Sequence, residues 1–275
     1  MKRLFSIFTT ALLLVTLCAC NNNSSDDGQH KSDYPVSAFD KTIETCPQKV
    51  VSLSPAVTEI ITELGSDAQL EGVSDNCVTD KDIARVGTSL IPDFDAIKEI
   101  KPDVIFVTAV TDESDKATLS ATGAVVIAVN APDSYGKLLD TYIEIAKVMS
   151  GNITGTRNAS TTFNRIDEQI KKLSAKASSK KVAVFFNGEM LIPTGALANE
   201  LISFGGGENI VTKQDMSDAD IISKKPDVIL CDAQCYDIIK ERFADYKVEQ
   251  FDVTLLESRG GKMVEAVEKL CKILK

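Results

Sequence analysis

The sequence predicts an α/β protein of two lobes, each a parallel-rich sheet flanked by helices, joined by one long α-helix. Three observations predict this class. From residue 34 onward, short β-branched runs alternate with helical patterns, which is typical of parallel sheets. The segment 96–105 resembles the segment 220–229, which indicates two related halves. Between them, residues 154–177 carry a single apolar stripe at helical spacing, formed by Phe163, Ile166, Ile170 and Leu173.

The N-terminal residues follow the order of an export signal. Lys2 and Arg3 precede an apolar run over residues 4–17, which closes on Leu17-Cys18-Ala19-Cys20. The run is too short for a membrane-spanning helix. Its end resembles a lipobox, so we expect a signal peptide over residues 1–19, cleavage before Cys20 and lipidation of the Cys20 sulfur. The alternatives are acylation of Cys18 and an ordinary signal peptide that is cut elsewhere.

A polar segment follows Cys20. Residues 21–33 contain no apolar side chain, and such a segment cannot bury enough surface to order itself. We therefore predict a lipidated N-terminus and disordered tether over residues 20–40. This tether would hold the protein on the extracytoplasmic face of the cell membrane. The one histidine of the chain, His30, lies in it.

The first lobe is predicted over residues 41–152. It begins with a strand at 49–53, after which Ser54 and Pro55 are the cap and first residue of a helix that Gly65 ends. Apolar periodicity and β-branched runs predict the rest of the lobe. These elements are strands at 70–73, 104–107 and 124–129 and a short helix at 94–100.

The connecting helix is predicted over residues 153–178, since neither Pro nor Gly interrupts residues 156–179. The second lobe then spans residues 179–275. Its predicted strands are 181–186, 228–230 and 248–251, and its predicted helices are 196–204, 220–223 and 262–274. The glycines at 205–207 follow a helix instead of preceding one, so we interpret them as a helix stop and not as a phosphate-binding loop.

Composition excludes several classes of function. The net charge of −10 falls to −12 once residues 1–19, with Lys2 and Arg3, are removed, and phosphate contact needs a basic surface. Nucleic acid is therefore excluded as a partner. No histidine lies in the predicted lobes, which removes the Ser-His and Cys-His arrangements of nucleophilic enzymes. A carboxylate-dependent hydrolase and a surface lipoprotein without a transport role stay open as alternatives.

Several motifs together resemble a known family. In the first half they are the segment Val50-Val51-Ser52-Leu53-Ser54-Pro55 and Lys101-Pro102-Asp103-Val104-Ile105. In the second half they are Pro193-Thr194-Gly195, residues 206–210 and Lys225-Pro226-Asp227-Val228-Ile229. In this order they resemble the periplasmic-type binding proteins of importers for vitamin B12, ferric siderophores and haem. The resemblance covers residues 49–275.

The resemblance implies a function. It indicates an extracytoplasmic solute-binding lipoprotein that captures a metal chelate, either a ferric siderophore, a corrinoid or haem. Acting as a monomer, the protein would deliver this chelate to the permease dimer of an ABC importer. It implies no catalytic residue, no resident metal and no cofactor.

The ligand is expected beyond the carboxyl ends of the strands, where loops of both sheets meet. The candidate ligand-binding residues are Ser54, Asn76, Ser89, Thr108, Asn187, Met216, Tyr236 and Arg259. Related corrinoid receptors carry aromatic side chains near four of these positions, whereas this chain has no Trp at all. Tyr236 or Met216 could ligate haem iron, but we interpret them as ordinary rim residues. Arg259 fits either an anionic chelate or a salt bridge.

Members of the family present an acidic residue on each lobe to the permease. The matching position in the first lobe is Asp95, and in the second lobe Asp218 and Asp220 flank the matching residue, Ala219. The resemblance also bears on the cysteines. A bridge from Cys271 to residue 205 is absent because that residue is glycine, so we expect Cys271 to be a buried free thiol. A pairing of Cys46 with Cys77 stays open.

Overall fold

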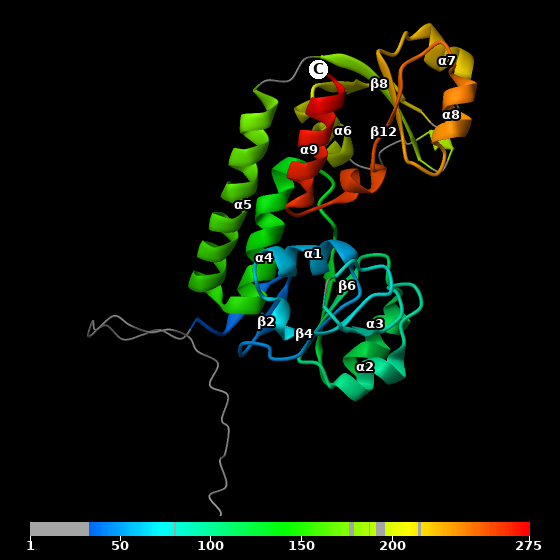
Figure 1. The fold of residues 1–275 in the computed structure, drawn as a ribbon. Coiled ribbons are helices and arrows are strands. Elements are labelled where there is room, and N and C mark those ends of the chain that lie inside the picture. The colour runs from blue at the N-terminus through cyan, green and yellow to red at the C-terminus, as the bar shows by residue number, and fades with distance from the viewer. Residues whose placement is uncertain (1–32, 80, 176–178, 187, 191–195, 214–215) are drawn as a thin grey trace, which may run out of the picture. The chain divides into compact units, whose positions relative to one another are not determined.

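The computed structural model describes residues 33–79, 81–175, 179–186, 188–190, 196–213 and 216–275 (Figure 1). Residues from Asp33 to Lys275 form one compact unit. Two parallel sheets flanked by helices lie within it, which confirms the predicted fold class. In the described part of the chain, no helix is both long enough and apolar enough to cross a bilayer. The predicted signal peptide and Cys20 lie outside the described residues.

The sheet of the N-terminal lobe has five parallel strands in the order β5-β4-β3-β6-β7. Helix α1 covers one face of this sheet, and α2 and α3 cover the other. Alternate strand residues therefore enter different apolar clusters, as expected for strands that are buried on both faces. The strands are Val50–Ser52 (β3), Leu70–Val73 (β4), Ala84–Arg85 (β5), Val104–Thr108 (β6) and Val125–Val129 (β7). The helices are Pro55–Glu63 (α1), Phe94–Ile100 (α2) and Glu113–Ser120 (α3).

The sheet of the C-terminal lobe has the order β10-β8-β11-β12, with β9 paired antiparallel to β8. Helices α6 and α9 pack on one face, and α7 and α8 pack on the other. The strands are Lys180–Phe186 (β8), Glu189–Met190 (β9), Gly207–Asn209 (β10), Val228–Cys231 (β11) and Val248–Gln250 (β12). The helices are Ala196–Phe204 (α6), Asp218–Ser223 (α7), Tyr236–Arg242 (α8) and Lys262–Ile273 (α9), with a 3-10 turn at Val253–Glu257.

Helix α5 (Asn152–Ser174) is the long helix that the apolar stripe predicts, and it packs along α4 (Leu138–Ser150). Phe163, Ile166 and Ile170 of the stripe are buried. The two helices approach closely at Gly155, where an added Cβ would lie 2.3 Å from the carbonyl oxygen of Ala146. The largest apolar cluster runs continuously from the first sheet through α4 and α5 to the second sheet. The two lobes therefore share one core.

The start of the folded part differs from the predicted tether, which extends to residue 40. Strands β1 (Val36–Ala38) and β2 (Lys41–Ile43) form an antiparallel hairpin, with Val36 and Ala38 buried. Just before them, the Asp33 carboxylate accepts hydrogen bonds from the N–H groups of Ile153 and Thr154, both at 3.1 Å. Asp33 therefore caps the free amides at the start of α5. The folded part therefore begins at Asp33, where the polar segment ends, and the predicted boundary at residue 40 is wrong.

The repeated segments have the same structural role in both lobes. In the first lobe, Lys101 has a positive φ of 54°, and the Asp103 carboxylate accepts the N–H of Lys49 at 2.9 Å. In the second, Lys225 has a φ of 53°, and the Asp227 carboxylate accepts the N–H of Lys181 at 2.7 Å. In each case a Lys-Pro-Asp turn ends a helix and fixes the start of the neighbouring strand. The internal similarity therefore reflects a repeated local structure.

Candidate ligand-binding site

The carboxyl ends of the N-terminal strands form a connected set of loops. All five strands are parallel, so these ends lie at one edge of the sheet. The loops are tied together, since Ser74 N–H donates to the Ser52 carbonyl at 2.8 Å and Asp75 N–H donates to the Gly87 carbonyl at 2.8 Å. Arg85 adds two bonds from its guanidinium, to the carbonyls of Ser74 at 3.0 Å and Cys77 at 2.7 Å. The edge is a preformed surface.

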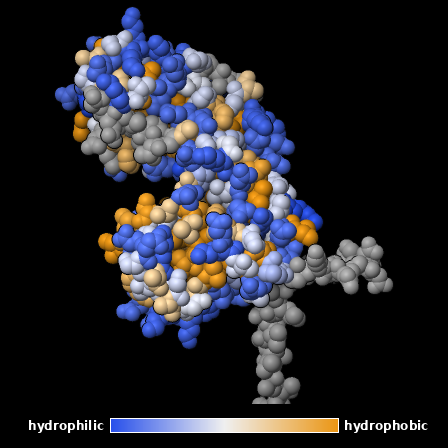
Figure 2. Space-filling view, turned by 180° about the vertical axis from the view of Figure 1, so that it is seen from behind, coloured by the Kyte–Doolittle hydropathy of each residue, from blue (hydrophilic) through white to orange (hydrophobic). Residues whose placement is uncertain are grey.

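Four aliphatic side chains on these loops are exposed to solvent. Their exposed fractions are 79% for Val78, 71% for Leu90, 79% for Ile91 and 70% for Val110. We call these four residues the aliphatic rim. Hydrophobic side chains are gathered on one side of the N-terminal lobe in Figure 2. Exposed apolar residues that gather in one place are characteristic of interaction sites, whereas scattered ones are ordinary.

The loop that carries Leu90 and Ile91 is held rigidly. Thr88 N–H donates to the Ile91 carbonyl at 2.9 Å, and the Thr88 hydroxyl accepts the Ile91 N–H at 3.1 Å. The Ser89 hydroxyl donates to the Leu53 carbonyl at 2.5 Å. Gly87 has a φ of 79°, and a Cβ there would lie 2.3 Å from the Ile91 carbonyl oxygen. The loop thus presents two aliphatic side chains without needing to order itself when a ligand binds.

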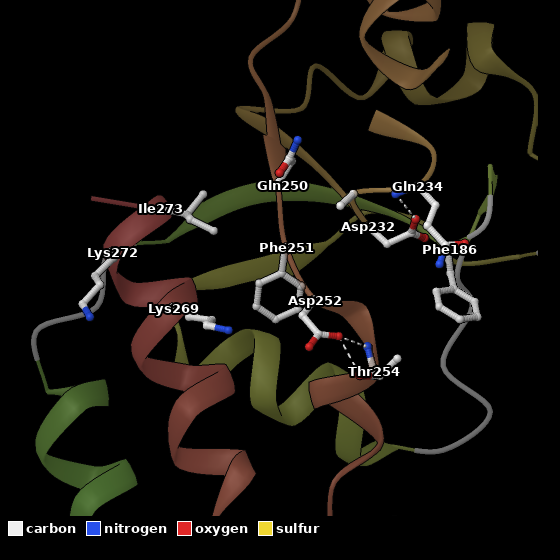
Figure 3. Close-up of a pocket in the computed structure, with 11 residues that line it drawn as sticks. Phe186, Asp232, Gln234, Gln250, Phe251, Asp252, Thr254, Lys269, Lys272 and Ile273 are labelled. Carbon is white, nitrogen blue, oxygen red and sulfur yellow. Dashed lines mark hydrogen bonds between the residues drawn. The ribbon is translucent and has the colours of Figure 1, made fainter. Parts of the chain in front are cut away.

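The C-terminal lobe has a cavity of about 790 Å³ along β12 (Figure 3). It begins at the carboxyl ends of β8 and β11, where Phe186 and Asp232 lie, and reaches the last turns of α9. Its size is within the range of small-molecule sites. The lining combines aromatic, acidic, amide and basic groups, chiefly those of Phe186, Phe251, Asp232, Asp252, Gln234 and Lys269.

Charged groups of both signs line this cavity. Figure 3 shows the Lys269 side chain extending toward Phe251 and Asp252. The Lys269 ammonium pairs with Glu265 at 2.7 Å, and one oxygen of Asp252 accepts the Thr254 hydroxyl at 2.6 Å. The aromatic ring of Phe251 lies between them in the view. The cavity can therefore receive a group with both apolar surface and polar atoms.

Three of the predicted ligand-binding residues belong to the framework. Ser54 is 2% exposed, and its hydroxyl accepts the Val57 N–H as the cap of α1. Ser89 is 8% exposed and holds the Leu53 carbonyl. Met216 is 4% exposed, and its sulfur accepts the Thr212 N–H at 3.5 Å. These side chains shape the loops, and the burial of Met216 does not suit an axial haem ligand.

Three others lie closer to the surface. Asn76 is exposed in the loop after β4, and Thr108 is half-buried at the end of β6. Tyr236 is the half-buried first residue of α8, with the Lys240 ammonium 5.3 Å from the centre of its ring. Asn187 lies outside the described residues. No group of three or more metal-ligating side chains occurs among the residues that the structure describes.

Arg259 lies at the junction of the two lobes. Its guanidinium donates to the carbonyls of Pro132 at 3.0 Å and Ser258 at 3.2 Å, and also to that of Glu257. Burial lowers the pKa of Arg259. Two nitrogens of the guanidinium therefore hold the backbone where the two lobes meet.

The candidate docking acids differ in their surroundings. Asp95 is exposed in the first turn of α2, next to the cap Asp93. Asp218 forms an ion pair with Arg242, whose Nε is 2.6 Å from the Asp218 carboxylate. Asp220 belongs to a capping box with Ser217, whose hydrogen bonds lower the pKa of Asp220. The two second-lobe acids thus have structural partners that Asp95 lacks among the described contacts.

The strand ends of the first lobe are predictable from the sequence, but the aliphatic rim is not among the predicted ligand-binding residues. Those residues are polar, aromatic, basic or potential metal ligands. The residues of the aliphatic rim stand singly, or as the pair Leu90-Ile91, between strand and helix patterns, where buried packing is the usual explanation. A usable signal is the pair Leu90-Ile91, because two adjacent apolar residues in a short loop cannot both face a core.

The two lobes share one core, and each presents strand ends that carry exposed apolar or cavity-lining groups. This arrangement is typical of a solute-binding protein. The comparisons agree with this class. Residues 50–268 match the family described as periplasmic binding protein, and the chain belongs to that family. Its members are solute-binding proteins, and this protein is therefore not an enzyme.

Individual proteins are similar to this chain in sequence or in fold. The chain is 22% identical to the "uncharacterized ABC transporter substrate-binding lipoprotein YvrC" of Bacillus subtilis, with 99% of this chain and 97% of the relative covered. It is similar in fold to the periplasmic vitamin B12 binding protein BtuF of Vibrio cholerae, with a TM-score of 0.62, 18% identity and coverage of 83% and 96%. The periplasmic heme binding protein HutB of Vibrio cholerae gives a TM-score of 0.67, 19% identity and coverage of 82% and 98%.

Proposed function

We propose that this protein is an extracytoplasmic solute-binding lipoprotein that captures a metal chelate and delivers it to the permease dimer of an ABC importer. The ligand would be a ferric siderophore, a corrinoid or haem. The protein would act as a monomer, held at the cell membrane by lipid on Cys20. Family membership supports the solute-binding role. The similarity to the Bacillus subtilis relative, which is named an ABC transporter substrate-binding lipoprotein, supports the importer and the anchor.

The main observation that supports a metal chelate as the ligand is the aliphatic rim. Val78, Leu90, Ile91 and Val110 remain exposed on a hydrogen-bonded loop edge. Covering one such side chain with an apolar ligand surface contributes about 1.5–3 kcal/mol when burial is complete. A chelate with an apolar periphery, such as a corrin, a porphyrin or a large siderophore, would obtain much of its affinity there. The polar groups of the C-terminal cavity would then orient its hydrophilic substituents.

Binding measurements with three probes test this proposal. Cyanocobalamin, haemin and ferrichrome are titrated into the purified domain, and we expect saturable binding of at least one. The double variant Leu90→Asp/Ile91→Asp should weaken that binding at least tenfold, because it places two charges against the apolar surface. Ile153→Asp is the matched control, since Ile153 is also exposed (57%) but lies at the start of α5.

Two results would count against the proposal. Failure of all three probes to bind would contradict the metal-chelate assignment. Tight binding that the double variant leaves unchanged would contradict the role of the rim. Circular dichroism of both variants confirms that the comparison is between folded proteins. Because the substituted side chains are exposed, we expect little change in stability.

The lipid anchor is tested separately. A Cys20→Ser variant of the full chain should lose labelling by a fatty-acid analogue and appear in the soluble fraction. Cys18→Ser is the matched control and should keep both label and membrane attachment. If Cys18→Ser loses the label and Cys20→Ser keeps it, the anchor is at Cys18.

A further inference from the structure

Two cysteines flank a wall of the C-terminal cavity. Cys231 is the last residue of β11, and Cys235 is the residue that precedes α8. The three residues between them, Asp232, Ala233 and Gln234, all line the cavity. Both thiols are free in the structure. The pair therefore closes a very short loop whose members belong to the candidate ligand site.

The side chains of the two cysteines turn inward to the same place. Cys231 is 0% exposed and Cys235 is 3% exposed, and both belong to the apolar cluster between the sheet and helices α7 and α8. The Asp232 carboxylate accepts the N–H of Cys235 at 3.2 Å, and the Asp232 carbonyl is 3.7 Å from the Cys235 sulfur. These bonds fold the chain back so that the Cys235 side chain returns toward the end of β11.

The pKa of Cys231 reflects the closeness of the two thiols. Burial is the largest cause that raises the pKa of Cys231 to about 12, and the neighbouring thiol of Cys235 is the next cause. A thiol with so high a pKa is almost never ionised at neutral pH, and thiolate is the reactive form. Once the domain has folded with both thiols reduced, the pair should therefore oxidise slowly. The same burial should protect a disulfide that has already formed.

We propose that Cys231 and Cys235 form an intramolecular disulfide when the domain folds in an oxidising environment. This inference rests on the proposed function in one respect only, since export is what would place folding outside the cytoplasm. Disulfides form and persist in such compartments. The proposed bond fixes the loop 232–234 at the cavity wall.

The oxidant is a disulfide-carrying exchange partner, such as an exported thiol–disulfide oxidoreductase or, in vitro, oxidised glutathione. The Cys235 thiolate attacks one sulfur of the partner disulfide, and the other partner sulfur leaves as a thiol. The Cys231 thiolate then attacks the Cys235 sulfur in the mixed disulfide and releases the second partner thiol. The two protein thiols lose two electrons and two protons, and the partner gains both.

Peptide mapping of the wild-type chain tests this directly and needs no ligand or importer. The chain is unfolded, reduced and refolded either with a mixture of oxidised and reduced glutathione or with excess reductant. Acid quenching, alkylation under denaturing conditions and trypsin digestion follow. No Lys or Arg lies between residues 231 and 235, so both cysteines stay on one peptide. Cys46, Cys77 and Cys271 lie on other peptides and are internal controls.

After oxidative refolding we expect the 231/235 peptide without alkyl groups and lighter by two hydrogens, and doubly alkylated after subsequent reduction. The reductant-refolded sample should be doubly alkylated at once. Cys231→Ser and Cys235→Ser should each leave the other cysteine available for alkylation. Hydrogen exchange at residues 232–234 should be at least severalfold slower in the oxidised protein. A doubly alkylated peptide after oxidative refolding, or a disulfide that joins either cysteine to Cys46, Cys77 or Cys271, would overturn the proposal.

Discussion

The carboxylate of Glu59, on helix α1 of the first lobe, accepts a hydrogen bond from the backbone N–H of Arg259, in the second lobe, at 2.7 Å. The other oxygen of Glu59 accepts the hydroxyl of Ser258, which is 6% exposed. One turn further along α1, the Glu63 carboxylate accepts the N–H of Gly261 at 2.7 Å. A single helix of one lobe thus holds the segment that leads into α9 of the other. We call these three contacts the lobe junction.

Removing the Glu59 carboxylate should destabilise the protein. Glu59→Ala leaves the Ser258 hydroxyl and the Arg259 N–H without their acceptor at a buried place, which costs about 1–3 kcal/mol. Urea unfolding measures the loss. Glu268→Ala is the control, because Glu268 forms only an exposed surface pair with Lys272, and such pairs contribute little to stability. Equal losses for both variants would show that the lobe junction does not contribute to stability.

The lobe junction and the shared core also bear on motion. A domain closes on its ligand when a few residues can absorb a large dihedral change. Here helix α5, the continuous apolar cluster and the three contacts of the junction all resist such a change. We therefore expect scattering profiles with and without bound chelate to nearly coincide. A clear fall in the radius of gyration on binding would contradict this expectation.

The sequence predicts those features that depend on neighbouring residues. The turns at Lys101-Pro102-Asp103 and Lys225-Pro226-Asp227 are local, and their similarity is visible without a structure. Hydrophobic periodicity likewise predicts α5, because its buried stripe lies within one helix. Helices α3, α4 and α8 are not among the predicted helices. Helix α4 nevertheless has a clear buried face, formed by Leu138, Tyr142, Ile145, Ala146 and Met149.

The lobe junction and much of the candidate site could not be predicted in this way. Glu59 and Arg259 are separated by 200 positions, and nothing in either local pattern indicates the other. Arg259 is predicted at a ligand because arginine is a common anion-binding residue, and its hydrogen bonds to backbone carbonyls between the lobes are visible only in the structure. The aliphatic rim has the composition of a core, and apart from the adjacent pair Leu90-Ile91 nothing in the sequence distinguishes it from buried residues.

The packing of α5 against α4 predicts a large effect at one glycine. Gly155→Ala places a methyl group 2.3 Å from the Ala146 carbonyl oxygen, which is backbone and cannot move aside cheaply. We expect a loss of roughly 1–3 kcal/mol, the usual cost of overpacking, although alanine favours helices intrinsically. Gly136→Ala is the control, because an added Cβ there has no neighbour within 4 Å. Thermal unfolding compares the two. A Gly155→Ala protein as stable as the control would contradict the close approach.

Asp33 predicts a dependence of stability on pH. Burial raises the pKa of Asp33, but hydrogen bonds from Thr154 and Ile153 outweigh it, so the pKa lies below its ordinary value. A lowered pKa in the folded state means that the contribution to stability is present above the ordinary value of about 3.9. It is lost as the pH falls through the folded-state pKa. Asp33→Ala should cost about 0.5–2 kcal/mol at neutral pH, as for other helix caps.

Unfolding midpoints between pH 7 and pH 2.5 check this sign. The difference between wild type and Asp33→Ala should be constant near neutrality and should shrink below about pH 4. Asp245→Ala, which removes an exposed turn carboxylate, should change stability by no more than about 0.5 kcal/mol at neutral pH. A difference for Asp33→Ala that grows as the pH falls would contradict the capping role.

Asp95 is predicted to contact the importer and not the ligand. It is exposed in the first turn of α2, whereas the cap of that helix is Asp93, whose carboxylate accepts the Ala96 N–H at 3.0 Å. A merely structural Asp95 would contribute about 0.3–1 kcal/mol by its place near the positive end of the helix. A docking Asp95 would instead meet positive charge on the permease, where a charge reversal is repelled.

Transport assays with the importer in proteoliposomes separate these roles. Asp95→Arg should lower the import rate at least tenfold, more than Asp95→Ala, while the dissociation constant of the bound chelate stays unchanged. Asp140→Arg is the matched control, since it reverses an exposed acid in the first turn of α4. In the second lobe we expect the double variant Asp218→Ala/Asp220→Ala to match Asp95→Ala. Asp218 also pairs with Arg242, and Asp220 also caps α7. The melting temperature of the double variant must therefore be measured together with its transport rate. Normal import by Asp95→Arg would show that this acid does not dock the protein.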